Sequence, residues 1–305
     1  MTSEGDGLFR SVQTRLVQHA KRLGVDPNLV LARYAVERLL YRLSRSEHAD
    51  RFVLKGALLL LVWLGESLRP TRDADLLGLG ELSDDALTQI FGELCVLEVE
   101  PDAMVYLADT ITVTAIRPED AHGGRRVTLS SKLGNARLKV QVDVGIGDAI
   151  TPLPTWLDYP SLLDLPQPRL RVYTPETVVA EKFHAMILLG MPNSRMKDFF
   201  DVFVLARGMN FGIEMLAGAI RATFDRRRTP VPEGPPLALT VAFGQAAEKR
   251  QQWTAFVRKS GINGAPSEFA DVVREISAFL EPVLVALQAP GESLDSQWPP
   301  GGPWS

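Results

Sequence analysis

The order of apolar and polar residues divides the chain into regions of different character. Between residues 10 and 46, apolar residues such as Leu29, Val36 and Leu39 recur at helical spacing, which predicts two or three helices. From about residue 52 to 150, short apolar stretches alternate with turns, and this pattern predicts the strands of one mixed sheet. The chain is therefore expected to have an α+β fold with helices before the sheet.

Strands are expected around Asp75 and at residues 111–116, 126–129 and 138–144. Gly134 and Asn135 lie between the last two segments and predict a hairpin turn. Beyond the sheet, Thr174, Pro175 and Glu176 supply a capping hydroxyl, a first-turn proline and an acid at the positive end of a helix dipole. A helix is therefore predicted to begin there and to run to about residue 189.

Further helices are predicted at about residues 195–206 and 237–287. The end of the chain after Pro290 is rich in proline and glycine and is expected to be disordered. The predicted organisation is a helical segment (1–50), a sheet core (51–170), a helical C-terminal region (171–289) and a disordered tail (290–305).

Composition sets limits on the function. The chain has 305 residues, 46% of them hydrophobic, and a net charge of -4, which argues against a histone-like coating of nucleic acid. Any nucleic-acid contact must therefore be local. The basic residues of the N-terminal helices have two interpretations, a surface for a phosphate backbone or an ordinary solvated face; they are Lys21, Arg22, Arg33, Arg38, Arg42 and Arg45.

The chain is expected to work in the cytoplasm. Its first residues carry acids where a signal peptide needs positive charge, and its longest apolar run, residues 57–64, is far shorter than a membrane span. The single cysteine, Cys95, lies in an apolar run and is expected to be a buried hydrophobic residue rather than a nucleophile. His19, His48 and His122 show no ligand spacing with one another, so the sequence gives no support for a zinc site.

Two acids carry the first chemical signal. Asp73 and Asp75 are two residues apart, so on a strand both side chains point to the same face. Paired carboxylates repel unless a cation lies between them, and hard oxygen ligands suit Mg²⁺ or Mn²⁺. The alternative is a polar turn at the edge of a strand.

A third acid lies on a strand with regular alternation. Val140, Val142 and Val144 define its buried face, so Asp143 points to the opposite face with Gln141. If this strand neighbours the one that bears Asp73 and Asp75, three carboxylates converge, enough for metal-assisted phosphoryl transfer. A solvated strand aspartate is the alternative.

Residues before and after these acids are candidates for phosphate contacts. The segment Lys55-Gly56-Ala57 combines a glycine that lets backbone N–H groups approach a triphosphate with an expected helix start at Ala57, although a tight turn without a ligand fits as well. Lys182 falls in an apolar stripe of its helix, so it either reaches solvent or meets a phosphate or carboxylate. Glu181 and His184 fall on a neighbouring face, where an ordinary surface pair is expected.

The next helix carries two further acids. Asp198 and Asp201 share one side of it, and Lys197 is a possible i,i+4 partner for Asp201. Asp198 has no equally evident helical partner and is therefore the better candidate for a site. Arg195, at the start of this helix, either binds phosphate or is exposed.

These motifs resemble, in their order and spacing, the AbiEii-type nucleotidyltransferase toxins, which are similar to the MenT toxins of type IV toxin–antitoxin and phage-defence systems. The resemblance covers roughly residues 50–205. It rests on the segments 52–57, 69–76 (which includes Arg69 and Thr71), 142–144, Glu181-Lys182 and 198–201. One departure is that Gly56 is followed by Ala57, where the superfamily usually has serine or glycine.

The resemblance implies a polymerase-β-like nucleotidyltransferase core. Asp73 and Asp75 would bind Mg²⁺ or Mn²⁺ and the nucleoside triphosphate, Lys182 would contact phosphate and Asp198 would complete the site. Asp143 would be a further metal ligand that orients or deprotonates the attacking hydroxyl. Thr71 keeps a hydroxyl near the acids despite Ala57. The resemblance also implies transfer of nucleotides to the 3′ end of transfer RNA, a block of translation and a cognate antitoxin encoded nearby.

Three other functions stay open from the residues alone. Asp143 with Glu181 and Lys182 also suits a metal-dependent nuclease, although a nuclease's glutamate and lysine usually lie on a strand. The chain would otherwise be a phosphotransferase that acts on protein, or a non-catalytic module that binds RNA. The products of the reaction would separate these classes.

Overall fold

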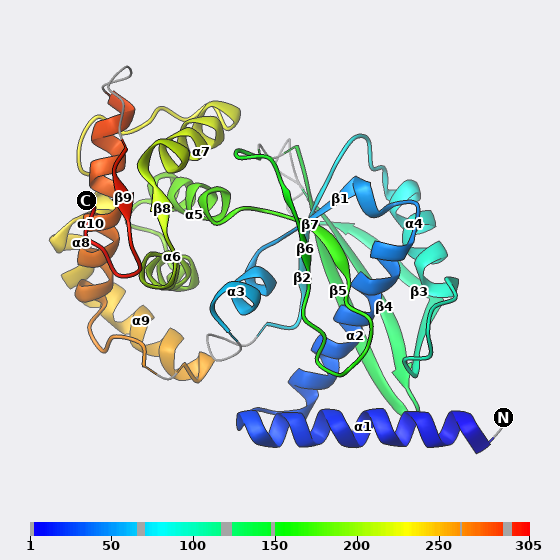
Figure 1. The fold of residues 1–305 in the computed structure, drawn as a ribbon. Helices are drawn as coiled ribbons and strands as arrows, with labels where there is room; N and C mark the ends of the chain where they lie inside the picture. Colours follow the sequence, from blue (N-terminus) through cyan, green and yellow to red (C-terminus); the bar gives the residue numbers. More distant parts are fainter. Residues whose placement is uncertain (1–2, 66–70, 117–123, 148–149, 263, 289–294) are drawn as a thin grey trace. The chain divides into compact units, whose positions relative to one another are not determined.

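The computed structural model describes residues 3–65, 71–116, 124–147, 150–262, 264–288 and 295–305 (Figure 1). Contacts along the chain divide it into two compact units. The first unit consists of Met1–Val62, Pro70–Gly147 and Thr155–Val172, and the second of Trp63–Arg69, Asp148–Pro154 and Tyr173–Ser305. Each unit has its own buried core.

A seven-stranded mixed sheet forms the frame of the first unit (Figure 1). Its spatial order is β3-β4-β5-β2-β1-β7-β6. The strands are β1 (Phe52–Lys55), β2 (Ala74–Gly78), β3 (Met104–Ala115), β4 (Arg125–Leu133), β5 (Ala136–Ile146), β6 (Thr155–Asp158) and β7 (Arg169–Val172). The helices are α1 (Ser3–Leu23), α2 (Pro27–Arg45), α4 (Asp84–Val96) and all but the last two residues of α3 (Ala57–Leu64), with a short 3-10 turn η1 (Ala49–Arg51).

The predicted strands and the predicted turn are confirmed. Three of the four expected segments lie within strands, and the fourth, 111–116, extends one residue past the end of β3. Leu133 pairs with Ala136 across a two-residue turn of Gly134 and Asn135. The α+β class with a mixed sheet therefore holds. In the N-terminal region the structure has two helices, α1 and α2.

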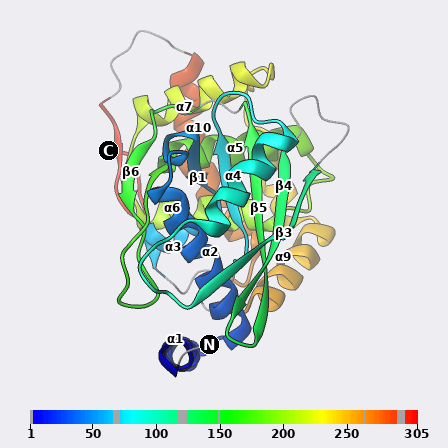
Figure 2. The same ribbon diagram turned by 90° about the vertical axis from the view of Figure 1, so that its right-hand side faces the viewer.

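Helices α2 and α4 cover one face of this sheet, as Figure 2 shows in the view turned by 90°. The alternation of β5 explains this cover, because Val140, Val142 and Val144 are all at most 1% exposed and face the helices. The intervening residues, including Asp143, lie on the opposite face of the sheet.

Two arginines of α2 depart from both sequence interpretations. Arg38 and Arg42 are buried, and they form ion pairs with the buried carboxylate of Asp102 at 3.1 Å and 2.6 Å. A buried charge is tolerated only with such a partner, so these side chains fasten α2 to the start of β3. They are neither solvated nor available to a phosphate backbone.

The second unit is mainly helical. Its helices are α5 (Pro175–Leu189), α6 (Met196–Gly208), α7 (Ile213–Arg226), α8 (Val241–Gln245), α9 (Ala247–Ser260) and α10 (Phe269–Gln288), with a 3-10 turn η2 (Leu237–Leu239) and two short strands, β8 (Phe211–Gly212) and β9 (Gln297–Trp298). Thr174 caps α5 as predicted, since its hydroxyl accepts a hydrogen bond from the backbone of Thr177. Aromatic rings from α6, α8, α9 and α10 form the core.

The prediction of a disordered tail is wrong for residues 295–305. Strand β9 pairs with β8, and the buried indole of Trp298 donates a hydrogen bond to the carbonyl of Ala206 at 2.6 Å. Trp304 stacks on Phe279. Burial of the two tryptophan rings stabilises the tail, although the residues around them are rich in proline and glycine, a composition that favours disorder.

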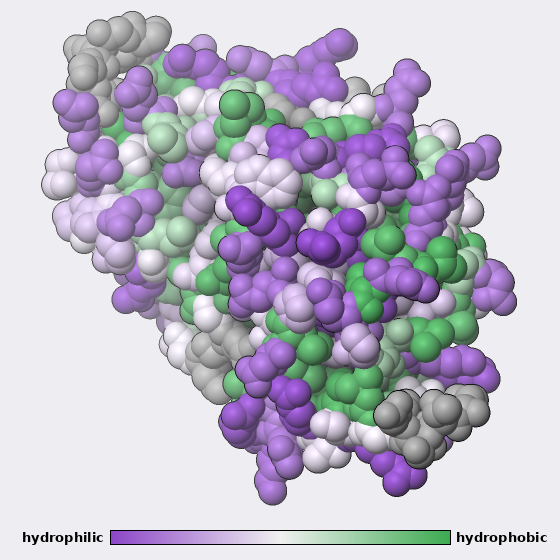
Figure 3. Space-filling model, turned by 45° about the vertical axis from the view of Figure 1, so that its right-hand side comes forward, coloured by the Kyte–Doolittle hydropathy of each residue, from purple (hydrophilic) through white to green (hydrophobic). Residues whose placement is uncertain are grey.

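Polar and apolar residues are mixed over the face drawn in Figure 3. None of the helices among the described residues is long and apolar enough to cross a membrane. Cys95 is half-buried, and burial raises the pKa of its thiol to about 11. This thiol is therefore a poor nucleophile, as the sequence predicts.

Candidate active site

The pairing of β2 with β5 brings the predicted acids together in the first unit. The two strands run parallel, and Asp75 lies beside Asp143 in their register. One residue before β2, Asp73 accepts a hydrogen bond from the amide of Gln141 at 3.0 Å. Because side chains two residues apart share a face, the three carboxylates lie on the sheet face opposite α2. The adjacency of these strands, which the sequence left as a condition, is confirmed.

Gly56, the residue after β1, lies against the acidic face. Lys55 pairs with Asp75 across β1 and β2, and Gly56 then takes a left-handed conformation with φ of 76°. A Cβ atom at position 56 would lie 2.2 Å from the Asp75 Oδ2 atom, closer than any real contact. Helix α3 begins at Ala57, as predicted. The glycine therefore gives the chain a turn and gives Asp75 its space.

Arg126 is a neighbour of the acids that the sequence reading missed. Its Nε atom donates a hydrogen bond of 2.8 Å to Asp143 Oδ1, and its Nη2 atom donates one of 2.8 Å to Asp143 Oδ2. The hairpin carries the signal that could have found it, because the turn pairs residue 133 with 136 and the same register pairs Arg126 with Asp143. Such a two-point contact fixes the plane of the carboxylate.

The charges of this face perturb one another. Burial and the nearby charge of Asp143 raise the pKa of Asp73, while Arg126 acts in the opposite direction. The hydrogen bonds to Asp143 raise the pKa of Arg126. Carboxylates held this close disfavour their own ionisation, and an added cation would relieve the repulsion. This is the electrostatic condition expected of a metal-binding face.

The structure describes all but one of the remaining candidates for this face. Thr71 donates a weak hydrogen bond of 3.5 Å from its hydroxyl to the carbonyl of Asp73, so a hydroxyl does lie near the acids. Lys55 is half-buried and Ala57 is buried. Arg69 lies outside the described residues.

The second unit contains a separate charged cluster on α5 and α6. The Nζ atom of Lys182 lies 3.0 Å from Asp198 Oδ1 and 2.8 Å from Asp201 Oδ2. Both aspartates are at most 1% exposed, and the lysine is 14% exposed. Of the two alternatives for Lys182, the apolar stripe therefore places it against carboxylates rather than in solvent.

Two expectations for this cluster are corrected. Asp201 pairs with Lys182 and not with Lys197, which is exposed, because the two helices pack side by side and bury the carboxylate. Asp198, whose helical partner is less evident from the sequence, has two cations near it. The second is Arg195, whose Nε atom lies 2.6 Å from Asp198 Oδ2 without the alignment of a hydrogen bond.

A buried lysine of α9 holds the loop before this cluster. Lys249 is fully buried, and its Nζ atom donates a hydrogen bond of 2.8 Å to the carbonyl of Asn193. The side chain of Asn193 in turn accepts a hydrogen bond from the backbone N–H of Arg195 at 2.9 Å. No spacing in the sequence links Lys249 to this loop, so sequence reasoning had no signal for it.

His184 is also placed differently from its expected surface position. It is buried, and its Nε2 atom lies 2.8 Å from the hydroxyl of Thr229. Glu181 accepts a hydrogen bond from the hydroxyl of Tyr173 and lies 3.7 Å from Arg227. Both residues of the expected surface pair therefore bind the loop after α7 or the start of α5.

A family model described as "Nucleotidyl transferase AbiEii toxin, Type IV TA system" matches residues 38–275. The chain belongs to this family. The matched range of AbiEii includes Asp73, Asp75 and Asp143 of the first unit and Lys182 and Asp198 of the second. It leaves out α1, the first part of α2, most of α10 and the tail, although the tail packs on the helices of its own unit.

Solved structures of similar fold support the architecture of this AbiEii chain. A Helicobacter pylori protein described as a candidate nucleotidyltransferase is 12% identical, with a TM-score of 0.50 over 87% of this chain and 98% of the other. JHP933 from Helicobacter pylori is also 12% identical, with a TM-score of 0.50 over 86% and 94% of the two chains. A search of curated proteins gives no match. The polymerase-β-like nucleotidyltransferase fold expected from the resemblance is confirmed.

Proposed function

We propose that this chain transfers a nucleoside monophosphate from a nucleoside triphosphate to the 3′ end of a transfer RNA, and so blocks translation. The observation that carries the proposal is the row of Asp73, Asp75 and Asp143 on one sheet face, with Asp75 beside Asp143 in register. Membership of the AbiEii family supports nucleotide transfer. The RNA acceptor and the effect on translation come from the resemblance to the MenT toxins.

The acidic face suits a divalent metal. Its ligands are all carboxylate oxygens, the set that Mg²⁺ and Mn²⁺ prefer. Burial and the nearby charge of Asp143 raise the pKa of Asp73, and the repulsion between the two carboxylates supports the proposal of a bound cation. Each Asp143 oxygen accepts one hydrogen bond from Arg126 and keeps a lone pair for a further partner. Asp73, Asp75 and Asp143 would hold the metal, which would stabilise charge on the transferred phosphoryl group.

The chain's own residues would then position the reactants. Arg126 fixes the Asp143 carboxylate, which would orient the attacking hydroxyl or accept its proton. Gly56, Lys55 and the first turn of α3 would receive the triphosphate, since backbone N–H groups at a helix start favour anions. Thr71 and Arg69 are proposed for the same contact on the strength of the family motif alone.

Lys182, Asp198 and Arg195 form a second part of the proposal, because they belong to the other unit. Asp198 and Asp201 hold the Lys182 ammonium in one place, so it can act as a fixed positive charge on a phosphate. Arg195 would add a second cation beside it. A loss of triphosphate affinity in Lys182→Met and Arg195→Gln, with the RNA affinity unchanged, would support this part.

The proposed partners follow from the family. A nucleoside triphosphate is the substrate, and a cognate antitoxin encoded nearby would restrain the enzyme, in keeping with a type IV toxin–antitoxin system. A role in phage defence and a place of action in the cytoplasm belong to the same proposal. Co-expression with the product of the adjacent gene tests the antitoxin, because relief of growth arrest is the expected result.

The direct test incubates purified protein with Mg²⁺, total transfer RNA and each of the four nucleoside triphosphates labelled at the α-phosphate. Labelled RNA that is one or more nucleotides longer is the expected product. Asp75→Asn should abolish it, whereas Asp85→Asn, at an exposed position of α4, serves as the matched control and should retain it. Removal of the metal with a chelator should also stop the reaction, and Mg²⁺ or Mn²⁺ should restore it.

Other products would reject the proposal. Shortened RNA would indicate a nuclease, and a γ-phosphate label on protein would indicate a phosphotransferase. Full toxicity of Asp75→Asn in cells, with RNA binding intact, would indicate a non-catalytic binding module.

A further inference from the structure

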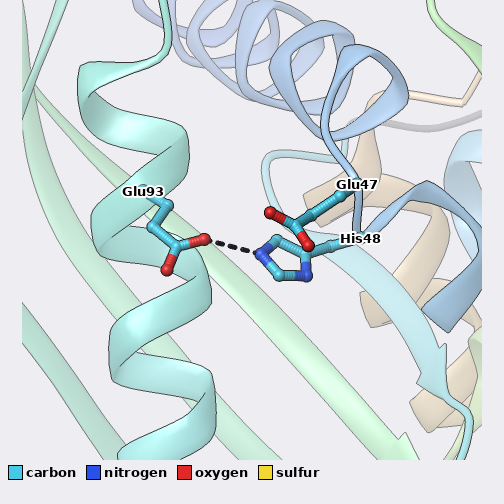
Figure 4. A group of neighbouring side chains, drawn as sticks. All are labelled: Glu47, His48 and Glu93. Atoms are coloured by element: carbon cyan, nitrogen blue, oxygen red, sulfur yellow. Dashed lines mark hydrogen bonds and ion pairs between the residues drawn. The ribbon is translucent and has the colours of Figure 1, made fainter.

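A histidine and two glutamates of the first unit come together away from the aspartate face. Glu47 and His48 follow the end of α2, and Glu93 lies on α4 (Figure 4). One ligand atom from each of the three residues lies within 4.8 Å of the other two. The His48 Nε2 atom is 2.7 Å from Glu93 Oε2. These three side chains are called the EHE cluster below.

Neighbouring groups hold the side chain of Glu93 and the backbone of His48 in place. The amide of Gln89 donates a hydrogen bond of 2.9 Å to Glu93 Oε1, which leaves Oε2 turned to the histidine. The hydroxyl oxygen of Ser46 accepts a hydrogen bond from the backbone N–H of His48 at 3.2 Å. Outer contacts of this kind orient the ligands of protein metal sites and reduce the entropy lost on binding.

The donors of the EHE cluster select a particular class of metal. One imidazole nitrogen and two carboxylates suit Zn²⁺, whereas Mg²⁺ prefers a set made of oxygen alone. Around Zn²⁺, adjacent ligand atoms are separated by about 3.3 Å in a tetrahedral site. The 2.7 Å contact must therefore open slightly, and the other pairs, which lie within 4.8 Å, must take up the same separation. Glu47 and Glu93 are exposed and can make this adjustment, and water can take the fourth position.

We propose that Glu47, His48 and Glu93 bind one Zn²⁺ ion. The bound ion would join the end of α2 to α4, and His48 is followed within four residues by β1, the strand that leads to Gly56. Its role is to clamp the elements that support the acidic face, without contact with the reacting groups. The proposal does not depend on the proposed function.

Zinc binding by the full-length protein tests this proposal. The variant Asp73→Asn/Asp75→Asn is used as the background, so that the aspartate face does not contribute to the signal. Isothermal titration with Zn²⁺ should give one site per chain, with binding that millimolar Mg²⁺ does not displace. Zn²⁺ at 100 times the dissociation constant should raise the Tm by about 5 °C or more.

Single substitutions then locate the site. His48→Gln and Glu93→Gln should each weaken Zn²⁺ binding by at least about tenfold and remove most of the Tm shift. His19→Gln, the same change on α1, is the matched control and should keep both. The Tm of each variant without zinc shows that it is folded.

Unchanged zinc affinity in His48→Gln, or no zinc binding by the parent protein, would overturn the proposal. A dissociation constant above about 100 μM would do the same, because the ion would then be adventitious only. Nucleotide transfer in Mg²⁺ should persist in His48→Gln, so failure of the transfer assay and failure of the zinc assay are separate results.

Discussion

Gly56 lies directly against the carboxylate of Asp75, and the contact leaves no room for a side chain. A Cβ atom at position 56 would be 2.2 Å from Asp75 Oδ2 and 2.8 Å from Cγ. The glycine also has a φ of 76°, a conformation that other residues rarely take. The turn that starts α3 and the place of a proposed metal ligand therefore depend on one position.

Gly56→Ala is expected to reduce both stability and nucleotide transfer. The left-handed backbone alone should cost about 1–2 kcal/mol, and the new methyl group must also push Asp75 aside. Urea unfolding and the labelling assay measure the two effects. Gly24→Ala is the matched control, because Gly24 has a φ of 67° and nothing within 4 Å of its Cβ direction. If the two variants retain equal activity, the contact with Asp75 has no functional weight.

Asp73→Asn should raise the Tm at neutral pH while it lowers transfer by roughly 10²–10³-fold, through loss of electrostatic stabilisation. The folded-state pKa of Asp73 is raised by burial and by Asp143, so the protonated carboxyl stabilises the fold at low pH. That stabilisation is lost as the pH rises through the raised pKa, and a neutral amide avoids the loss.

The pH dependence of this variant checks the sign. The Tm advantage of Asp73→Asn should shrink as the pH falls and should vanish below about pH 4, where an ordinary aspartate is protonated. The measurement is the Tm of both proteins between about pH 3 and about pH 8, a range that begins below the ordinary pKa of aspartate and extends well above it. At about pH 7 an ordinary aspartate is ionised, so a Tm of the variant below that of the parent protein would contradict this prediction.

Lys182→Met should destabilise the second unit by about 3–5 kcal/mol, because it leaves the buried carboxylates of Asp198 and Asp201 without this cation. The double variant Lys182→Met/Asp201→Asn should recover part of the loss. Lys197→Met, on the exposed side of α6, is the control and should change stability by less than about 0.5 kcal/mol. Equal effects of the two lysines in urea unfolding would show that the cluster is not a buried ion pair in solution.

Trp298→Ala tests the ordered tail. Its buried ring packs on Phe279 and its indole N–H bonds to Ala206, so truncation should cost about 3–5 kcal/mol. Trp298→Phe keeps most of the apolar area and should cost less. Limited proteolysis near residue 295 reports whether the tail detaches. If Trp298→Ala does not change the stability, the tail is not packed in solution and the disorder predicted from its composition holds.

The sequence by itself determined the local structure. The alternation of residues 138–144, the turn at Gly134 and Asn135 and the cap at Thr174 each depend on neighbouring residues, and the structure confirms all three. The same local rules identified Asp73 and Asp75 as a pair and placed Asp143 on the polar face of its strand. The hairpin turn also sets the register that places Arg126 opposite Asp143.

Only the tertiary structure decided which of these elements meet. Strand β2 lies parallel to β5, which is more than 60 residues away, and no spacing along the chain specifies that pairing. The tertiary structure also decides the partners of Lys182, the buried ion pair of Arg38 with Asp102 and the packing of Trp298. Each depends on apolar surfaces that pack and on charges that find partners once water is excluded, and both are properties of the folded core rather than of a short segment.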